Sequence, residues 1–537
     1  MPINSGHLLE INDLSVRYPS SSEWVLDGLY LSLSSQDRFA LVGPSGSGKS
    51  TVARVALNML PQGSICKGGL LIAGNDPRNL NSVELRTLRG SQVGVIFQDP
   101  MTRLNPLMTI GTHLLDTLQS HRPNKSFAWR KQKADQLLQK VGINPERFDA
   151  YPHEFSGGMR QRIVIALAIA LEPLLVIADE PTTSLDVEVA NKVMGELTSL
   201  CNEIGSALLL ITHDLAMAAK WCDQIGILDQ GKIVEHGLSN QILMNPYSHT
   251  GKKLISAARK KEDFDSYFVF NSPSVLEVNN LRCWHPVSVA PFRVHWIKAV
   301  DEMSFSLHKG EILGIVGASG CGKSTLCRAL LGLTPIRGGT VKWQGFNISS
   351  KKKNHLNISK NIQMVFQDPL ACLNPKMRVG EAIADPFFIH NLYTRAEASE
   401  KVRHLLDQVG LTPAEKFQNR LPCELSGGQQ QRVVIARALA LSPKVLICDE
   451  SLSMLDAEIQ VEILNLLLHL KEDLELSILF ITHDLLVASS FCNRLIILDK
   501  GRIVEEGTGK LLFNQPQAEM TKRLVAACPR FPDQDGN

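Results

Sequence analysis

The sequence predicts an α/β fold in which one phosphate-binding domain occurs twice in tandem, and three observations support this prediction. Short apolar runs such as "RFALVG", "LLVIAD" and "ALLLIT" are typical of buried strands in a largely parallel sheet. The pattern G-x-x-x-x-G-K-[ST] occurs at residues 43–50 and again at 317–324. Five landmarks recur in the same order at offsets of 269 to 274 residues, in a chain of 537 residues that is too long for one core.

The composition is that of an ordinary globular protein, with 44% apolar residues, 20% charged residues and a net charge of +2. Such a small net charge provides no field that would attract nucleic acid, and we expect no nucleic-acid partner. The first residues lack the pattern of a secretory signal. The most apolar segment, residues 163–179, is interrupted by Glu172 and Pro173 and predicts a buried helix and strand rather than a membrane span. Eleven cysteines without a C-x-x-C pair are typical of reduced thiols in a cytosolic protein.

Each glycine-rich stretch follows an apolar run and precedes a predicted helix, as a phosphate-binding loop requires. The loop N–H groups can surround phosphate, while Lys49 and Lys323 can reach the β- and γ-phosphates. We therefore expect the chain to bind nucleoside triphosphate. Ser50 and Ser324 can bind Mg²⁺ through their hydroxyls. The other loop residues expected to contact the nucleotide are Gly43, Ser45, Gly46, Gly48, Thr51, Gly317, Ser319, Gly320, Gly322 and Thr325.

Two acidic pairs end later apolar runs, in "LLVIADE" and "KVLICDE". Asp179 and Asp449 are suited to the Mg²⁺ shell. Glu180 and Glu450 are suited to polarising an attacking water. A structural acidic pair is the alternative, but a second carboxylate beside a metal ligand is costly unless the site uses it.

Two further repeated motifs can contact phosphate. His213 and His483, in the repeated "ITHD", end another apolar run and can reach the γ-phosphate. A Ser-Gly-Gly tripeptide begins two predicted helices, in "FSGGMRQR" and "LSGGQQQR". The glycines cost helix stability and expose N–H groups, which at a helix start form a site for an anion.

This order of motifs resembles that of the ATP-binding cassette (ABC) ATPases, over nearly the whole chain and twice. The resemblance implies two nucleotide-binding domains, each with a mixed β-sheet core and a helical subdomain that carries the Ser-Gly-Gly signature. It also implies that the halves pair head to tail within the chain, with Asp186 and Asp456 at the D-loop position between them. ATP binding would then close the pair and hydrolysis would release it.

The resemblance assigns the motif residues to two composite ATP sites, and it adds Gln98 and Gln367 as Mg²⁺ ligands. One site would combine Lys49, Gln98, Asp179, Glu180 and His213 with Ser426, Gly427, Gly428 and Gln429. The other would combine Lys323, Gln367, Asp449, Glu450 and His483 with Ser156, Gly157, Gly158 and Met159. Both glutamates and both histidines are present, so both sites are expected to hydrolyse ATP.

Adenine recognition differs between the halves. Tyr18 matches the aromatic residue that stacks on adenine in this family, although an ordinary strand-end tyrosine is the alternative. The second half reads "LRCWHPV", which places His285 at this position with Trp284 beside it. The sequence leaves open which of these two rings stacks on adenine.

Three features of the sequence resemble those of the ATPase subunits of oligopeptide, dipeptide and nickel importers. No spanning segment is found, so a channel would be a separate protein. The stretches "FQDPMTRLNPLMTIG" and "FQDPLACLNPKMRVG" resemble the region that docks the membrane subunits in those importers. The segments "NPYSHTGKKLISA" and "NQPQAEMTKRLVAA" resemble those that follow each cassette. The first half resembles that group's D-type subunit and the second half its F-type subunit.

This resemblance implies two membrane permease subunits, an extracytoplasmic substrate-binding protein and a peripheral location on the cytoplasmic face of the membrane. We expect a first domain at residues 1–255, a linker at 256–274 and a second domain at 275–537. Many relatives carry a cysteine-rich tail proposed to hold an iron–sulfur cluster. Here Cys528 is alone near the end, and we expect no cluster.

The sequence leaves alternatives open for the transported cargo and for the wider class of cassette protein. Ser451, which follows Glu450 where most members have proline, and the short tail resemble nickel-type more than peptide-type subunits. The competing class is a twin-cassette translation factor that acts on the ribosome. Such factors usually carry a longer charged linker and basic extensions, and neither is present here.

Cys321 lies inside the second phosphate-binding loop, where the first loop has Ser47. The loop N–H groups, the helix N-terminus and Lys323 are expected to favour its thiolate and make it reactive. A small filler residue without function is the alternative.

Overall fold

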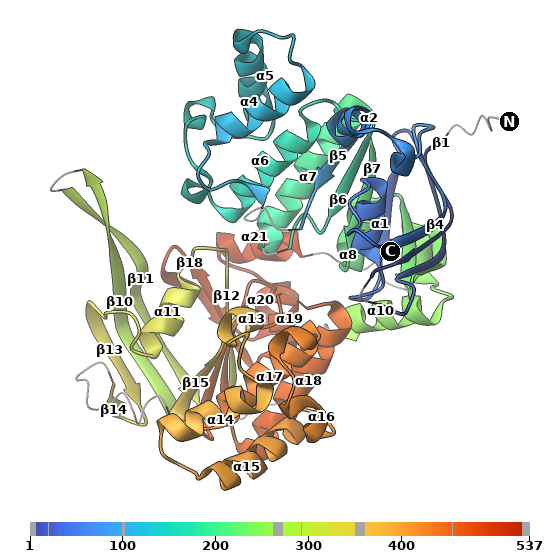
Figure 1. Cartoon of the computed structure of the whole chain (residues 1–537). Coiled ribbons are helices and arrows are strands. Elements are labelled where there is room, and N and C mark those ends of the chain that lie inside the picture. The colour runs from blue at the N-terminus through green and yellow to red at the C-terminus, as the bar shows by residue number, and fades with distance from the viewer. Residues whose placement is uncertain are drawn as a thin grey trace.

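The computed structural model describes residues 7–19, 21–98, 103–183, 185–260, 272–290, 293–348, 360–453 and 455–528. Within them the chain forms two halves of the same design, one above the other in Figure 1. Each half has a six-stranded mixed sheet, a smaller antiparallel sheet and a set of helices that carries the Ser-Gly-Gly motif. The predicted α/β fold and its tandem duplication are confirmed.

The six-stranded sheet of the first half has the strand order β5-β6-β7-β3-β8-β9, in which only β9 is antiparallel to its neighbour. Every residue of β6 and β7 is buried. Burial on both faces explains why these strands appear in the sequence as continuous apolar runs. The strands are β3 (Arg38–Val42), β5 (Val93–Ile96), β6 (Leu175–Asp179), β7 (Ala207–Thr212), β8 (Gln224–Asp229) and β9 (Lys232–Leu238).

The second half repeats this sheet in the order β15-β16-β17-β12-β18-β19. The carboxyl ends of parallel strands meet at one edge of a sheet, so the motifs that follow β12, β16 and β17 gather there. The strands are β12 (Ile312–Gly317), β15 (Ile362–Val365), β16 (Val445–Asp449), β17 (Ser477–Thr482), β18 (Arg494–Asp499) and β19 (Arg502–Gly507).

A smaller antiparallel sheet packs against each main sheet, in the order β2-β1-β4 in the first half and β11-β10-β13-β14 in the second. One apolar cluster of each half joins these two sheets, and another joins the main sheet to the helices. The β10–β11 hairpin reaches beyond the body of the molecule in Figure 1. The strands are β1 (His7–Arg17), β2 (Leu26–Ser34), β4 (Ile65–Ile72), β10 (Ser274–Ala290), β11 (Arg293–His308), β13 (Gly338–Trp343) and β14 (Phe346–Asn347).

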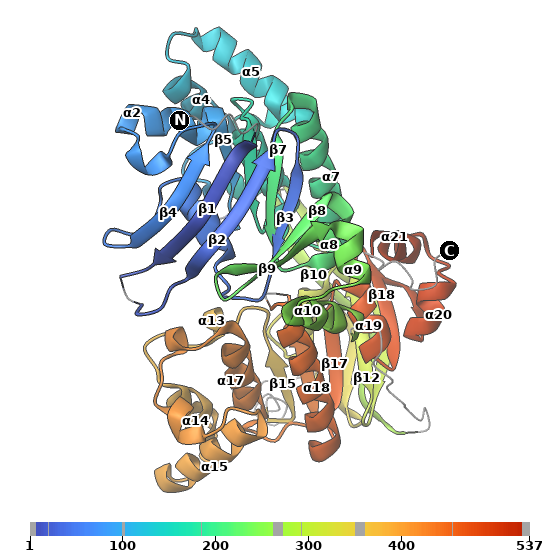
Figure 2. The same ribbon diagram turned by 90° about the vertical axis from the view of Figure 1, so that its right-hand side faces the viewer.

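The helical subdomain of each half is built around the helix that begins at the Ser-Gly-Gly motif. In the first half these helices are α4 (Ile110–His121), α5 (Phe127–Lys140) and α6 (Gly157–Ile169). In the second half they are α14 (Val379–Ile389), α15 (Arg395–Gln408), α16 (Ala414–Gln418) and α17 (Gly427–Leu439). Figure 2 shows the two sets at opposite ends of the molecule.

The remaining helices cover the sheets and the boundary between the halves. Those of the first half are α1 (Lys49–Ala56), α2 (Ser82–Thr87), α7 (Val187–Ile204), α8 (Leu215–Trp221), α9 (Ser239–Met244) and α10 (His249–Lys260). Those of the second half are α11 (Lys323–Leu330), α13 (Pro369–Cys372), α18 (Ala457–Leu474), α19 (Leu485–Phe491), α20 (Gly509–Asn514) and α21 (Glu519–Ala527). The described residues also form five short helical turns: η1 (Pro77–Asn79), η2 (Leu88–Gln92), η3 (Pro145–Arg147), η4 (Pro152–Glu154) and η6 (Pro422–Glu424).

The apolar segment at residues 163–179 is a buried helix followed by a buried strand, as the sequence predicts. Helix α6 ends before Glu172, which turns the chain with a left-handed φ of 53° and lets β6 enter the sheet. In the described part of the chain, no helix is long and apolar enough to cross a membrane. Helix α10 runs through the predicted domain boundary at residue 255, and β10 begins at Ser274.

Candidate functional site

Both glycine-rich loops connect the middle of their sheet to a helix, from β3 to α1 and from β12 to α11. The helices begin directly after Gly48 and Gly322, whose φ angles of 104° and 111° are left-handed. A side chain on Gly322 would also place its Cβ 1.9 Å from the carbonyl oxygen of Ala299. Conformation and space therefore both require glycine at this position.

The two loop lysines are buried beneath their own loops. Lys49 is 7% exposed and Lys323 is 4% exposed. Each Nζ donates hydrogen bonds to the carbonyl oxygens of the first two residues of its loop, at distances of 2.7 to 3.1 Å. Burial lowers the pKa of Lys49, although Glu180 and Asp456 act in the opposite direction. A buried cation below a loop of N–H groups suits a phosphate chain.

The two predicted metal-ligand aspartates are the last residues of β6 and β16. Ser50 Oγ donates to Asp179 Oδ1 across 3.1 Å, so the first loop hydroxyl and the first carboxylate meet as predicted. Asp449 is 7% exposed, and its buried Oδ1 has no hydrogen-bond partner. Burial raises the pKa of both carboxyl groups. A cation would relieve this cost of burying a carboxylate.

The glutamates that follow these aspartates have a strained backbone, with φ of 48° at Glu180 and 47° at Glu450. Such angles cost about 1–3 kcal/mol for a residue with a side chain and persist only where neighbours enforce them. Here the N–H of Glu180 donates to Ile211 O (2.8 Å) and that of Glu450 to Ile481 O (2.9 Å). The adjacent strand thus fixes the turn that sets the direction of each carboxylate.

In the first half, the carboxylate of Glu180 receives three polar contacts. Gln98 Nε2 donates to Oε2 at 2.7 Å, Thr183 Oγ1 donates to the same oxygen at 2.9 Å, and His213 Nδ1 lies 3.1 Å from Oε1. The structure therefore brings together Gln98, Glu180 and His213, which three separate motifs predicted. Sequence reasoning missed Thr183, whose only signal is a hydroxyl three residues after the glutamate.

The second half holds its glutamate differently. Glu450 lies 3.4 Å from Lys323 Nζ and 3.6 Å from His483 Nδ1. Ser453, the counterpart of Thr183, donates to the backbone carbonyl of Glu450 (3.0 Å) rather than to its carboxylate. Gln367 and Glu450 are both described, and no hydrogen bond joins them.

Neighbouring groups keep the pKa of both glutamates low despite burial. Burial alone would raise the pKa of Glu180 and of Glu450. The contacts from His213 and His483 are the largest opposing effects and the loop lysines act in the same direction, so each pKa lies below its ordinary value. Burial conversely lowers the pKa of His213, and its hydrogen bond to Glu180 reverses the direction and raises it. Both glutamates are therefore ionised at neutral pH, as a base that polarises water must be.

The Ser-Gly-Gly motifs begin helices α6 and α17, as predicted. Ser156 Oγ and Ser426 Oγ cap these helices by accepting from the N–H groups of the residues three positions later. The first glycine of each motif is exposed and the second is buried. A Cβ on Gly158 would lie 2.4 Å from Val189 Cγ1. The second glycine therefore permits close packing, while the first leaves the helix start open to an anion.

The halves meet through their D-loop aspartates, and the contact is reciprocal. Asp186 Oδ2 accepts from the N–H of Ser319 in the second loop (3.1 Å), and Asp456 Oδ2 accepts from the N–H of Ser45 in the first loop (3.2 Å). Each aspartate also caps the helix that follows it. Each half thus contacts the other half's phosphate-binding loop.

Each signature helix starts beside this contact. A Cβ on Gly157 would lie 3.5 Å from Leu185, and one on Gly427 would lie 3.7 Å from Leu455. These leucines directly precede the D-loop aspartates. No hydrogen bond joins a signature motif to the opposite loop among the described residues, so the D-loops make the polar contact between the halves at these loops.

The two positions expected to stack on adenine have different surroundings. Tyr18 Oη lies 3.2 Å from Thr51 Oγ1 and accepts from Arg54 Nη1 (3.4 Å), which places its ring at the start of α1. In the second half, Lys298 Nζ lies 4.9 Å from the ring centre of Trp284. His285 follows in β10 and is exposed, whereas Trp284 is half-buried, so the choice between the two rings stays open.

The prediction of a reactive Cys321 is wrong. The side chain is 5% exposed, and burial raises the pKa of its thiol, although Lys323 acts in the opposite direction. Removing the thiolate from water therefore outweighs the positive groups around the loop.

The expected order of thiol labelling follows from burial. At neutral pH a maleimide should modify the exposed Cys423 well before Cys321, because reagent reaches the exposed side chain directly, whereas burial limits access to Cys321 and raises the pKa of its thiol. Peptide mass mapping of briefly labelled protein measures this order, and Cys423→Ser should remove the fast fraction. Faster labelling of Cys321 would show that its loop opens readily.

Two phosphate-binding loops, each with an acidic pair, a histidine and a facing D-loop from the other half, define a nucleoside triphosphatase of duplicated design. Residues 26–183 and 300–453 match the family model described as ABC transporter, and the chain belongs to this family. ATP is the nucleotide that these cassettes bind and hydrolyse.

Two relatives match nearly the whole chain. The peptidoglycan transport ATP-binding protein YejF of Agrobacterium fabrum is 39% identical over 534 residues, covering 98% of this chain and 97% of that protein. The glutathione import ATP-binding protein GsiA of Escherichia coli is 35% identical over 566 residues, covering 98% of this chain and 90% of that protein. A dimeric cassette solved with ADP and Pi aligns with a TM-score of 0.39 and 28% identity over 43% of this chain and 98% of its own.

Proposed function

We propose that the chain is the ATP-hydrolysing subunit of an ABC importer and that it hydrolyses ATP at two composite sites between its halves. The reciprocal bonds between D-loops and phosphate-binding loops carry this proposal, because they pair each loop with the other half. One site combines the Lys49 loop with the signature that starts at Ser426. The other combines the Lys323 loop with the signature that starts at Ser156.

The chemistry assigned to each site follows from its charges. The glutamate is an ionised base that accepts a proton from the attacking water. The water oxygen bonds to the γ-phosphorus as the bond from the γ-phosphorus to the β–γ bridging oxygen breaks. The loop lysine and the signature N–H groups stabilise the charge on the phosphates, and the histidine orients the glutamate. These roles belong to Glu180, Lys49 and His213 in one site and to Glu450, Lys323 and His483 in the other.

The residues around the phosphate edge fit a hard divalent cation. Asp449 Oδ1 is a buried carboxylate oxygen without a hydrogen-bond partner, which is what a cation ligand requires. Mg²⁺ bound there would neutralise part of the negative charge on the phosphates. The residues proposed to hold it are Ser50, Gln98 and Asp179 in the first site and Ser324, Gln367 and Asp449 in the second.

The named activities of the relatives support import of a peptide-containing cargo. YejF is named for peptidoglycan transport and GsiA for glutathione import, and both peptidoglycan and glutathione contain peptide. We therefore favour a peptide-containing cargo over nickel. Two membrane permeases and a substrate-binding protein would complete the transporter, with this chain peripheral on the cytoplasmic face of the membrane. Both relatives are transport proteins, which disfavours the ribosome-bound alternative.

The loops that follow Gln98 and Gln367 are the proposed contacts with the permeases. Leu104 and Leu373 are each 3% exposed and pack within their own half. The residues after them are exposed, and Leu107 is 85% exposed. The permease surface is therefore expected just beyond these leucines, at residues 105–107 and 374–376.

Cross-linking tests the permease contact. In a variant that lacks the more accessible native thiols (Cys66, Cys372 and Cys423 to Ser), Leu107→Cys and Lys376→Cys should each form an adduct with a co-purified permease through a short thiol-to-amine reagent. Val83→Cys, whose native side chain is 69% exposed on α2, is the matched control and should form none. An active complex without an adduct at either loop would contradict the assignment, and recovery with ribosomes rather than membranes would favour the alternative.

A further inference from the structure

The last helix of each half crosses to the other half. Helix α10 of the first half lies along α18 of the second, and α21 of the second half lies along α7 of the first. Both views show α10 beside the second half, and Figure 1 shows α21 beneath the first. Leu254 and Leu524 occupy equivalent positions of these helices and are 4% and 3% exposed, and each belongs to the apolar cluster of its own half.

The polar contacts of these helices are reciprocal. Lys253 on α10 lies 3.9 Å from Glu458 on α18, and Arg523 on α21 forms an ion pair with Glu188 on α7. Both members of one pair are related to those of the other by the same offset of 270 residues. One added contact occurs on one side only, where Asn191 Nδ2 donates to the carbonyl oxygen of Ala527 at 2.7 Å. Because equivalent residues of the two halves make the same ion pairs, the contact is a specific interface rather than an accidental one.

A carboxylate of its own half fixes the start of each crossing helix. Glu235 on β9, which is 1% exposed, accepts from the N–H groups of Tyr247 and Ser248 just before α10. Glu505 on β19 accepts in the same way from Gln517 and Ala518 before α21. Each helix is therefore held at its start by its own half while it lies against the other half.

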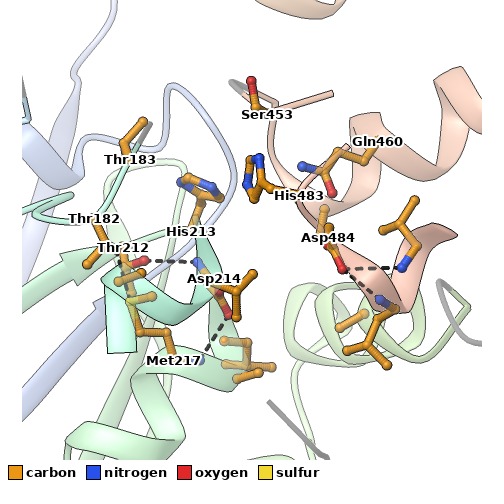
Figure 3. A pocket seen from close by; sticks show the side chains of 18 of the residues that line it. Thr182, Thr183, Thr212, His213, Asp214, Met217, Ser453, Gln460, His483 and Asp484 are labelled. Carbon is orange, nitrogen blue, oxygen red and sulfur yellow. Dashed lines mark hydrogen bonds between the residues drawn. The ribbon is translucent and has the colours of Figure 1, made fainter. Parts of the chain in front are cut away.

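Helix α10 lies on one side of a cavity of about 200 Å³ between the halves. Leu254 and Ala258 of α10 form part of its wall, and His213 and His483 face it from the two halves (Figure 3). Helix α10 thus adjoins the space that separates the two catalytic regions. Among the described residues, no hydrogen bond or ion pair joins α10 or α21 to either phosphate-binding loop.

We propose that α10 and α21 form an interface between the halves that needs no nucleotide, so that the pair stays associated through the whole ATP cycle and closes about these helices. The contacts that carry it are the close approach of α10 to α18 and of α21 to α7, two ion pairs and one hydrogen bond, and none includes a residue assigned to ATP. The interface would keep the composite sites aligned after each hydrolysis step, beyond what the fused chain alone provides.

A chain cut between its halves tests this interface. A protease recognition sequence placed between residues 260 and 272 allows the folded, full-length protein to be cleaved into two fragments. Without nucleotide and with EDTA, the fragments should co-elute in gel filtration at low micromolar concentration. Lys253→Glu together with Arg523→Glu places like charges opposite Glu458 and Glu188 and should weaken fragment association about tenfold.

Two further variants make the result specific. Adding Glu188→Lys and Glu458→Lys restores complementary charge and should restore association. The neighbouring Lys252→Glu with Lys522→Glu changes the charge equally at exposed positions of the same helices and should leave association unchanged. Separation of the cleaved wild-type fragments without nucleotide would overturn the proposal, as would equal association of the reversed and wild-type proteins.

Discussion

Replacing Glu180 and Glu450 together with Gln should lower steady-state ATP turnover by about 10²–10⁴-fold and leave ATP binding intact. The substitution keeps the size of each side chain but removes the ionised carboxylate that accepts the proton of the attacking water. Both glutamates have pKa values below their ordinary value, so the wild-type base is charged at neutral pH. Because ATP then persists, it should hold the two halves closed.

Turnover, nucleotide retention and compactness measure this effect together. The double variant should retain ATP through gel filtration and show a smaller hydrodynamic radius with Mg²⁺·ATP, whereas wild type should retain little. His213→Ala with His483→Ala provides a comparison, because it removes the orienting partner and leaves the base. If the double Gln variant still turned over ATP at the wild-type rate, another group would be the base.

The sequence sufficed for the parts of the site that short, fixed-order motifs encode. Gln98, Glu180 and His213 come from three motifs far apart in the chain, and the structure places them within hydrogen-bonding distance. This agreement has a physical basis, because each residue follows the carboxyl end of a strand in the sheet and parallel strands bring those ends to one edge.

The remaining features depend on contacts that no local pattern records. Cys321 illustrates the limit, since the positive groups around its thiol are visible in the sequence but the burial that outweighs them is not. The sequence also does not show that α10 and α21 each contact the opposite half. The sequence of an amphipathic helix shows that it has an apolar and a polar face, but which elements contact each face is set by tertiary packing. The contact of Thr183 could not be predicted from the sequence either, because Ser453, at the equivalent position of the second half, makes a different hydrogen bond.

Replacing the two aspartates at the strand ends should lower ATP turnover without lowering the stability of the nucleotide-free protein. Asp179→Asn with Asp449→Asn should lower ATP turnover by about 10²–10³-fold, because the metal shell loses both charged ligands and the phosphates lose much of their neutralisation. The same change should leave the nucleotide-free protein as resistant to heat as wild type, or more so. Burial raises the pKa of both carboxyl groups, which means that keeping them ionised costs folding free energy.

The sign of the pH dependence separates this cost from other effects. A carboxyl group whose pKa is raised on folding destabilises the protein when ionised, so wild-type stability from this source should increase as the pH falls from above the folded pKa to below the unfolded pKa. The Asn variants should lack that component. Thermal unfolding across pH, with and without Mg²⁺·ATP, measures it, and Mg²⁺·ATP should raise the melting temperature of wild type but scarcely that of the double variant. A variant that is less stable than wild type without nucleotide would show that the carboxylates support the fold, and the buried, unpartnered oxygen of Asp449 would then need an explanation other than a cation.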